Sequence, residues 1–594
     1  MASFPVGLMR TLIGLAQGIA LYLLYRAAHA VVKGWPATEP MTFAALAAVA
    51  LFIPILMMAG FRNLRPRTLA AWGLLAALVC AGLAVYDIYR EPLLPNGSTG
   101  LRLTLSPALV ACLPAILFIV HTLIVAGEAE RKLVASYQGY FDVSWKLGVQ
   151  LSLAVAFVAA FWALLWLGAA LFQIIGIRAI AQTIQREWFS IPATATALAY
   201  AIHVTDARAE LVRGVRTLAL TLLGWLLPML TGFAVAFLLA LPFTGLQPLW
   251  STRSATGILL AAAGSLIVLI NAGYQDGQEE GVAKLVRYAR SVAALVLVPL
   301  VGLAVCGLML RAQQYGWTPT RIIAGACIVV AACYAAGYAA AALRPGFKLK
   351  WLESTNIATA YVIVAVVLCL LSPLADPARI AVADQLRRLA SGRETPETFD
   401  FKFLRFHAGR HGRAELEKLA RATEGQQAAA IAEKAKVALA LVTPWQGKAQ
   451  FHATAEQRAT NITVVYPQGQ ALPDSFIRTD WTTVTAPAAL PRCLTADDRC
   501  EAALIDLDAD GTAEVLLFVP ARSGNGILTA GAFKAESGNA WTWLGPITNA
   551  QCAGVRDGLA RGQIETVDVR MKDFNVNGVR LRVNTVRGCP PRAR

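Results

Sequence analysis

Long apolar stretches without a single charged side chain limit most strongly what this chain can fold into. Residues 44–59, 218–241 and 357–371 are examples. A helix of about 20 apolar residues crosses the roughly 30 Å of hydrocarbon in a bilayer. Because the runs are continuous and do not alternate with polar residues, they exclude a transmembrane barrel, and a backbone in lipid must close its hydrogen bonds as helix. The sequence therefore predicts an α-helical polytopic membrane protein.

The number of spans depends on one short segment. Ten runs are clear: 11–32, 41–60, 69–86, 105–125, 147–175, 218–241, 255–272, 292–310, 322–342 and 357–371. Residues 188–203 are fewer and include Pro192, so this segment is either an eleventh span or a re-entrant element. The choice sets the orientation of every later span.

Loop charge favours eleven spans. Residues 1–375 contain 25 Lys and Arg against 13 Asp and Glu, which is +12 of the total net charge of +16. Short cytoplasmic loops collect Lys and Arg. With eleven spans and the N-terminus inside, 16 of these 25 basic residues are cytoplasmic, whereas ten spans leave only 10 inside. We therefore expect about eleven helices in a bacterial inner membrane, with a cytoplasmic N-terminus and a periplasmic C-terminal region.

The same distribution bears on partners. The positive excess lies in short loops, where it fits contact with the anionic headgroups of the lipid bilayer, so nucleic acid is not expected as a partner. A second basic segment, RFHAGRHGR at 405–413, places His407 and His411 four residues apart. Gly409 and Gly412 weaken the helix that a two-histidine metal site needs, so an anionic lipid or an acidic envelope polymer is the favoured partner of this segment.

The chain divides into three predicted regions. Residues 1–375 form the transmembrane bundle, and Pro373 and Pro377 with a rise in charge mark its end. Residues 376–445 have amphipathic helical periodicity and predict a juxtamembrane helical region. Residues 446–594 predict a small β-rich soluble domain from short alternating runs, namely NITVVYP, SFIRTDWTTV, AALIDL, EVLLFVP and GVRLRVNTV.

Cysteine usage agrees with a periplasmic tail. Six of the ten cysteines lie in or beside apolar spans, where cysteine packs as a small hydrophobic residue. The tail has four, Cys493, Cys500, Cys552 and Cys589, an even number that an oxidising compartment joins into two disulfides. Three connectivities are possible, and we favour 493 with 500 and 552 with 589. Four free thiols in a cytoplasmic tail are the alternative.

An acidic loop is the sharpest chemical motif. The spacing of Asp506, Asp508 and Asp510 ahead of Gly511 is typical of calcium ligands, and Thr512 and Glu514 add further oxygens. The flanking runs predict strands, and the twelfth position is Leu517, so the loop is not an EF-hand. It resembles the acidic loops of FG-GAP-type repeats in a single copy. A structural calcium ion and an acidic β-turn without an ion are equally consistent with the pattern.

Two external loops suggest a surface site. The segments 242–253 and 314–321 contain Trp250, Arg253, Trp317 and Arg321, which either anchor the chain at the interface or recognise a lipid-linked substrate. No Walker A, GxSxG or HExxH motif is present, so the sequence indicates no catalytic residues and no cofactor other than a possible calcium ion. His121 is the one clearly central ionisable residue of the spans.

Five segments carry a family resemblance. They are LIGLAQGIALYLLYRA at 12–27, LPFTGLQPLWSTRSAT at 241–256, QYGWTPTRI at 314–322, SPLADPARIAVADQLRRLASG at 372–392 and FDFKFLRFHAGRHG at 399–412. Together they resemble a bacterial membrane family known as domain of unknown function forty-one fifty-three, over roughly residues 10–445. The resemblance implies a polytopic membrane protein and brings no activity or catalytic residues with it.

Three functions remain open from the sequence. The favoured hypothesis is a non-enzymatic envelope protein whose bundle holds or passes a lipid or other amphiphile while a periplasmic domain engages a partner. The alternatives are a membrane-embedded transferase that acts on a lipid-linked substrate at the loop site, and a secondary transporter.

Overall fold

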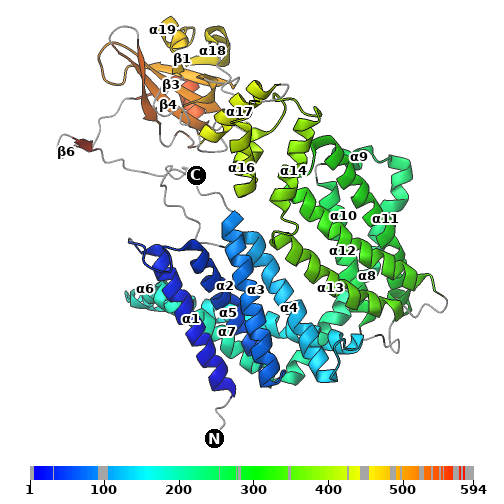
Figure 1. Cartoon of the computed structure of the whole chain (residues 1–594). Coiled ribbons are helices and arrows are strands. Elements are labelled where there is room, and N and C mark those ends of the chain that lie inside the picture. Colours follow the sequence, from blue (N-terminus) through cyan, green and yellow to red (C-terminus); the bar gives the residue numbers. More distant parts are fainter. Residues whose placement is uncertain are drawn as a thin grey trace. The chain divides into compact units, whose positions relative to one another are not determined.

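The computed structural model describes most of the chain and separates it into two compact units, Met1–Leu441 and Val442–Arg594. The described residues are 6–30, 32–90, 105–252, 254–275, 277, 283–344, 350–423, 427–441, 454–481, 490–494, 498–520, 527–536, 540–547, 550, 552, 554–565, 574–576 and 579–581. The first unit is helical and the second contains a five-stranded sheet (Figure 1). The predicted fold class, a polytopic helical membrane protein with a β-rich C-terminal part, is confirmed.

Ten of the described helices are long and apolar enough to cross a membrane. They are α1 (Val6–His29), α2 (Pro40–Gly60), α3 (Pro66–Arg90), α4 (Pro107–Glu130), α5 (Tyr137–Ile174), α8 (Ala209–Thr244), α10 (Ala255–Tyr274), α11 (Lys284–Tyr315), α12 (Pro319–Ala342) and α13 (Lys350–Leu371). Each overlaps one of the ten predicted runs, and seven contain their run completely. Short helices α6 (Ala179–Ile184) and α9 (Gln247–Ser251) lie in the connections.

The doubtful segment 188–203 forms α7 (Glu187–Ala207), which is outside that set of ten. It lies antiparallel along α1, because Gly7 is against His203 near one end of the pair and Gly18 is against Pro192 near the other. Contact is so close at Gly14 that an added Cβ would lie 2.8 Å from the carbonyl oxygen of Ala195. The helix therefore runs beside a membrane span for most of the length of that span, which a re-entrant hairpin does not do.

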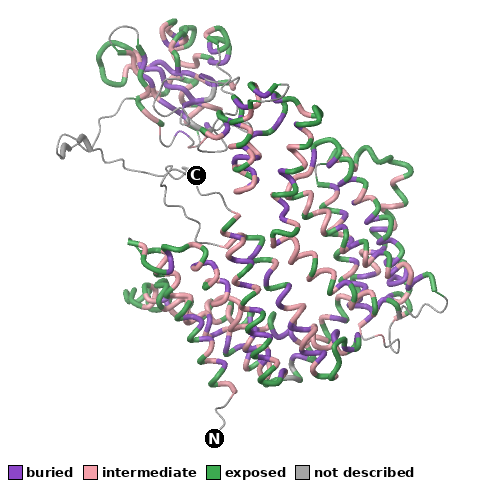
Figure 2. Tube along the Cα trace, viewed as in Figure 1, coloured by how far each residue is buried: buried purple, intermediate pink, exposed green. Residues whose placement is uncertain are grey.

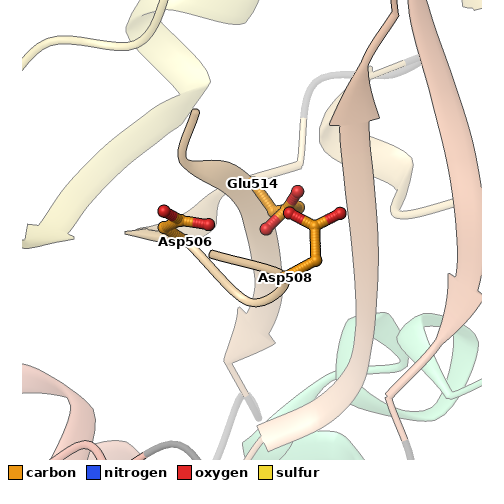
Figure 3. Close-up of side chains that lie close together, drawn as sticks. All are labelled: Asp506, Asp508 and Glu514. Carbon is orange, nitrogen blue, oxygen red and sulfur yellow. The ribbon is translucent and has the colours of Figure 1, made fainter. Parts of the chain in front are cut away.

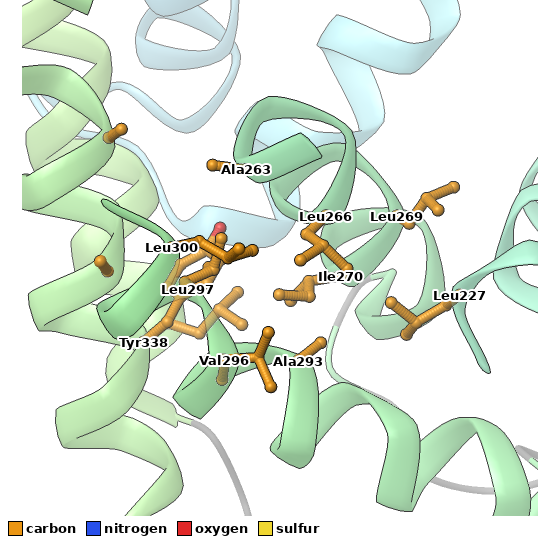
Figure 4. Packing of buried hydrophobic residues seen from close by; sticks show 14 of the residues in the cluster. Leu227, Ala263, Leu266, Leu269, Ile270, Ala293, Val296, Leu297, Leu300 and Tyr338 are labelled. Carbon is orange, nitrogen blue, oxygen red and sulfur yellow. The ribbon is translucent and has the colours of Figure 1, made fainter. Parts of the chain in front are cut away.

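Two buried clusters hold the bundle together. One is formed by α8, α10, α11 and α12, where Leu266, Leu297 and Leu300 interlock around Tyr338 (Figure 4). The other joins α2, α3 and α4. Exposed positions recur along the helices of the bundle (Figure 2). Many of them are large apolar side chains, including Leu74 of α3, which is 65% exposed. In water such exposed side chains would be unfavourable, so they form the surfaces that lipid covers.

A helical layer follows the last span, as the sequence predicted. It contains α14 (Pro377–Ala390), α15 (Phe401–Phe406), α16 (Gly409–Leu419) and α17 (Ala428–Ala440) around a core that includes Phe401 and Leu404. Asp376 caps α14 by accepting from the backbone N–H groups of residues 378 and 379, and its other oxygen accepts from the Tyr86 hydroxyl of α3 at 2.8 Å. The end of α13 and the C-terminal end of α3 therefore lie at the same face of the bundle.

The second unit is built on a sheet of order β1-β2-β3-β4-β5, with β1 parallel to β2 and the other pairs antiparallel. Its strands are β1 (Ile462–Tyr466), β2 (Cys500–Ile505), β3 (Glu514–Pro520), β4 (Ile527–Ala535) and β5 (Trp541–Pro546). Helices α18 (Ala455–Asn461), α19 (Asp474–Arg478) and α20 (Val555–Ala560) and a two-stranded pair, β6 (Phe574–Val576) with β7 (Val579–Leu581), complete it.

One predicted strand is wrong. The run SFIRTDWTTV contains α19, which begins directly after Pro473, and residues 482–484 lie outside the described part. The large aromatic side chains of the run, Phe476 and Trp481, both enter the core, where their rings stand 5.0 Å apart beside Phe533 and Trp541. Aromatic packing, and not strand pairing, holds these two side chains.

Candidate functional site

A buried ion pair joins the beginning of α1 to the end of α7. Arg10, only 1% exposed, donates from Nη1 to Asp206 at 2.9 Å and from Nη2 to the carbonyl oxygen of Phe61 at 3.0 Å. The two charged residues are 196 positions apart in the chain. Arg10 stands about 6 Å from the start of α1 at 1.5 Å per residue, so the pair lies near the helix ends and was not noticed among the central residues of the spans.

Helix α5 supplies two further donors to the same carboxylate. Gln150 Nε2 donates to Asp206 Oδ1 at 3.4 Å, and Lys146 Nζ lies 3.8 Å from that oxygen. Arg10 occupies Oδ2. Both oxygens of this carboxylate are therefore engaged, and the local balance of full charges is positive.

His121 of α4 stands near this ion pair with one ring nitrogen engaged. The indole N–H of Trp72 donates to His121 Nδ1 at 3.2 Å. Because an indole N–H is only a donor, Nδ1 must accept, and the neutral imidazole then carries its hydrogen on Nε2. That Nε2 is buried and has no hydrogen-bond partner among the described residues.

These groups line one end of a cavity of about 230 Å³ within the bundle. Its walls come from α1, α2, α4, α5 and α7, and most of them are apolar, including Phe52, Leu117, Phe118 and Leu151. The polar lining is limited to four side chains: Arg10, His121, Gln150 and Asp206. An apolar space with a few polar groups at one end is typical of a small-molecule site.

A second cavity, of about 270 Å³, lies on the other side of Phe118, which lines both. At its polar end Asn271 donates to the Tyr338 hydroxyl, Tyr338 donates to Asn356, and Asn356 donates back to Asn271, each at 2.7 Å. This closed ring of hydrogen bonds ties α10, α12 and α13 together and leaves none of its three members without a partner. We therefore regard the ring as structural.

The predicted loop site is not assembled as a binding site by the described residues. The Trp250 carbonyl accepts from Arg311 at 3.0 Å, and Arg321 donates to the carbonyl of Gly316. Trp317 is held through its backbone N–H, which donates to Asp384 of α14 at 2.8 Å. Arg253 lies outside the described residues. The three described members make contacts in the turns that follow α8 and α11, and recognition of a lipid-linked substrate by these loops stays a prediction.

Helix α14 clamps the turn between α11 and α12. Gln385 donates to the carbonyls of Tyr315 and Trp317, and Arg388 donates to those of Gln313 and Gln314. An added Cβ at Gly316, whose φ is +71°, would lie 2.9 Å from Arg388 Cδ. The motifs at 314–322 and 372–392 are therefore two halves of one contact.

The basic segment 405–413 makes contacts of its own within the first unit. Arg410 lies over the ring of Tyr89 at 4.1 Å, and Arg413 pairs with Glu417 at 3.1 Å. Burial lowers the pKa of Arg405, which is only 4% exposed. An anionic lipid or polymer as the partner of this segment stays a prediction.

The acidic loop joins β2 to β3 and gathers three of its five predicted ligands. One oxygen each of Asp506, Asp508 and Glu514 lies within 4.8 Å of the others (Figure 3). Asp506 also accepts from the backbone N–H groups of Asp510 and Gly511, which shapes the turn. Glu514 is 2% exposed and accepts from the backbone of residue 507 at 2.7 Å. The carboxylate of Asp510 is outside this group and accepts from the backbone N–H of Thr512 at 2.8 Å.

A lysine from the neighbouring strand β4 reaches the same oxygens. Lys534 Nζ donates to Asp508, donates to Asp510 at 2.7 Å, and lies 3.7 Å from Glu514. The hydrogen bonds to Asp508 and Asp510 raise the pKa of Lys534, and Lys534 in turn lowers the pKa of Asp510. The ammonium thus supplies the positive charge that a calcium ion would bring, so a calcium ion must displace it. Calcium stays a prediction.

The tail cysteines are oxidised where they are described. Cys493 and Cys500 form a disulfide with a Cα to Cα distance of 5.9 Å, which confirms the first favoured pairing. Cys552 is also disulfide-bonded, while its expected partner Cys589 lies outside the described residues.

Comparison with known proteins agrees with this architecture. The model of a family described as a domain of unknown function, DUF4153, matches residues 13–419, which include the helices that line the two cavities except for the start of α1, where Arg10 lies. No curated protein and no solved structure matches the chain. Since the match covers more than half of the sequence, the chain belongs to the DUF4153 family of multi-pass membrane proteins.

Proposed function

We propose that this protein binds an amphiphile, such as a lipid, in the cavity beside the Arg10–Asp206 pair. The observation that carries the proposal is the lining, which is apolar along its length and polar at one end. The polar end is at the start of α1 and the end of α7, near a face of the bundle. An amphiphile in a bilayer has the same polarity, with its headgroup at a face and its chain within the hydrocarbon.

The energetics of the cavity favour an occupant. An empty cavity in a protein interior costs about 24 cal/mol per Å³, so about 230 Å³ corresponds to roughly 5 kcal/mol. An acyl chain recovers that free energy because it fills the space with dispersion contacts. The hydrocarbon of the membrane offers such chains in excess.

Filling the cavity with a side chain tests the proposal. Leu117→Trp places an indole in the cavity, whereas Leu74→Trp is the matched control on the lipid-facing side of α3, where the native leucine is 65% exposed. The full chain, purified in a mild detergent, is examined by native mass spectrometry for retained lipid. We expect retained lipid in the wild type and in Leu74→Trp, and its loss in Leu117→Trp.

Equal lipid retention in both variants would contradict the proposal. Should Leu117→Trp not fold, Ala59→Leu adds bulk to another wall of the same cavity and serves in its place. Absence of retained lipid from the wild type as well, together with no uptake of added lipid, also overturns it.

We further propose that α7 is the eleventh span and that the chain sits in a bacterial inner membrane with its N-terminus in the cytoplasm. The antiparallel contact of α7 with α1 supports an odd number of spans. With eleven spans the basic loops are mostly cytoplasmic and the unit with the Cys493–Cys500 disulfide is periplasmic, where disulfides persist. That unit then engages a periplasmic partner.

Reporter fusions test this orientation. Alkaline phosphatase and a fluorescent protein that folds only in the cytoplasm are fused in turn after Arg594. Phosphatase activity without fluorescence is expected. Fluorescence without phosphatase activity would leave ten spans and a cytoplasmic tail.

A further inference from the structure

We propose that the cavity beside the Arg10–Asp206 pair selects amphiphiles whose headgroup is an anionic hydrogen-bond acceptor, either a carboxylate or a phosphate. The inference rests on the proposed function and adds the chemical class of the ligand. It depends on which polar atoms of the cavity are already engaged and which are not.

Two buried donors of the cavity lack a partner among the described residues. They are Nε2 of His121 and Nε of Arg10, and these side chains are only 5% and 1% exposed. The bond from Trp72 fixes the hydrogen of His121 on Nε2, so this atom can only donate. A guanidinium Nε–H also donates and never accepts.

The carboxylate of the cavity, in contrast, already has a protein donor or cation at each of its two oxygens. Asp206 is contacted by Arg10 on one oxygen and by Gln150 and Lys146 on the other. Two cations and one carboxylate leave a net charge of +1 beside the neutral imidazole. A ligand that brings acceptor oxygens and a negative charge is therefore complementary, whereas an ammonium headgroup meets two unpaired donors and an excess of like charge.

The position of the donors agrees with a headgroup site. Arg10 is in the second turn of α1, and Asp206 is one residue from the end of α7, so both belong to one face of the bundle. The apolar side chains of Phe52 and Pro114 line the cavity farther from that face, nine residues from Phe61 along the chain and seven residues from His121 along α4. A single acyl chain thus enters the apolar part while its oxygens meet His121 and Arg10.

The test compares three probes of equal chain length, a fatty acid, an alkyl phosphate and an alkyl amine, on the full chain in a non-ionic detergent. Binding is measured by native mass spectrometry. We expect the acid and the phosphate to bind about ten-fold more tightly than the amine, the effect of one hydrogen bond to a charged group. His121→Phe is expected to reduce acid and phosphate binding about ten-fold and to leave amine binding unchanged.

Thr122→Val is the matched control, because Thr122 is the next residue of α4, is equally buried and without a partner, and lines the neighbouring cavity instead. Equal affinity of all three probes for the wild type would overturn the headgroup inference and leave amphiphile binding intact, as expected if water alone satisfies the two donors. Binding of no probe would overturn the proposed function itself. The ranking on the wild type needs no variant, so it remains decisive if His121→Phe does not fold.

Discussion

Removing one charge of the Arg10–Asp206 pair should destabilise the bundle asymmetrically. Asp206→Asn leaves a guanidinium that is 1% exposed without its counter-charge, with only neutral oxygens to accept from it. Breaking a buried ion pair from one side costs about 3–5 kcal/mol because an uncompensated charge stays inside. Arg10→Met leaves a carboxylate that is 11% exposed and keeps Gln150 and Lys146, so we expect a smaller loss of about 1–3 kcal/mol.

The free energy of unfolding is measured by titration with a denaturing detergent, followed by circular dichroism, on the full chain. The double variant should lose less free energy of unfolding than the two single variants lose together, because it contains neither an unpaired guanidinium nor an unpaired carboxylate. An exposed pair gives the control: Arg213 and Glu210 are 68% and 86% exposed, and Arg213→Gln should cost under about 1 kcal/mol.

Two results would refute the reasoning. A loss of free energy of unfolding under about 1 kcal/mol for Asp206→Asn would mean that the charged guanidinium of Arg10 is not buried in the bundle. Strict additivity in the double variant would mean that the two side chains do not interact.

Three further predictions follow from other contacts. Gly14→Leu should separate α1 from α7, because even a Cβ at this position would lie 2.8 Å from the carbonyl oxygen of Ala195. We expect a lower yield of folded membrane protein, and a normal yield would contradict the prediction. Cys493→Ala should lower the stability of the C-terminal unit by about 2.5 kcal/mol, from the chain entropy of a closed loop of about 8 residues. Thermal unfolding of this unit in the full chain measures the loss, and an unchanged Tm would contradict the prediction. Lys534→Met should destabilise that unit between about pH 4 and pH 10. The lowered pKa of Asp510 stabilises the folded unit above the unfolded pKa of Asp510, and the raised pKa of Lys534 stabilises it below the unfolded pKa of Lys534. A loss of stability that persists unchanged at pH 3 would contradict this prediction.

Hydropathy predicted the spans well because lipid imposes a single requirement along each helix. A run such as 218–241 has one stable conformation in hydrocarbon, whatever its neighbours are. Segment 188–203 was ambiguous because it is less apolar. Its position is set by close packing of small residues, where Ala199 of α7 meets Gly14 of α1. Packing of that kind depends on a helix nearly 200 residues away.

The cavity site could not be predicted from the sequence for a similar reason. Arg10 and Asp206 stand at helix ends, where a charge is ordinary, and only the fold joins them over 196 residues. Lys534 likewise reaches the acidic loop from β4, so the spacing of the aspartates alone left calcium and a plain turn open. In both cases the charged residues are visible in the sequence, but which of them pair with each other is not.

The described contacts of the loop residues are structural, and a lipid-linked substrate at these loops stays a prediction. Trp317 and Gly316 are constrained by the contact with α14, and their neighbours in the motif are bound through backbone carbonyls. Aromatic residues beside prolines at a membrane surface serve docking as readily as ligand recognition.

A cryo-electron microscopy map of the full chain in lipid nanodiscs tests the central claim most directly. We expect elongated density in the cavity, with its wider end within hydrogen-bond distance of His121 Nε2 and Arg10 Nε and its narrow end near Phe52 and Pro114. A cavity that is closed by repacked side chains, or one that contains only isolated water peaks, would contradict it.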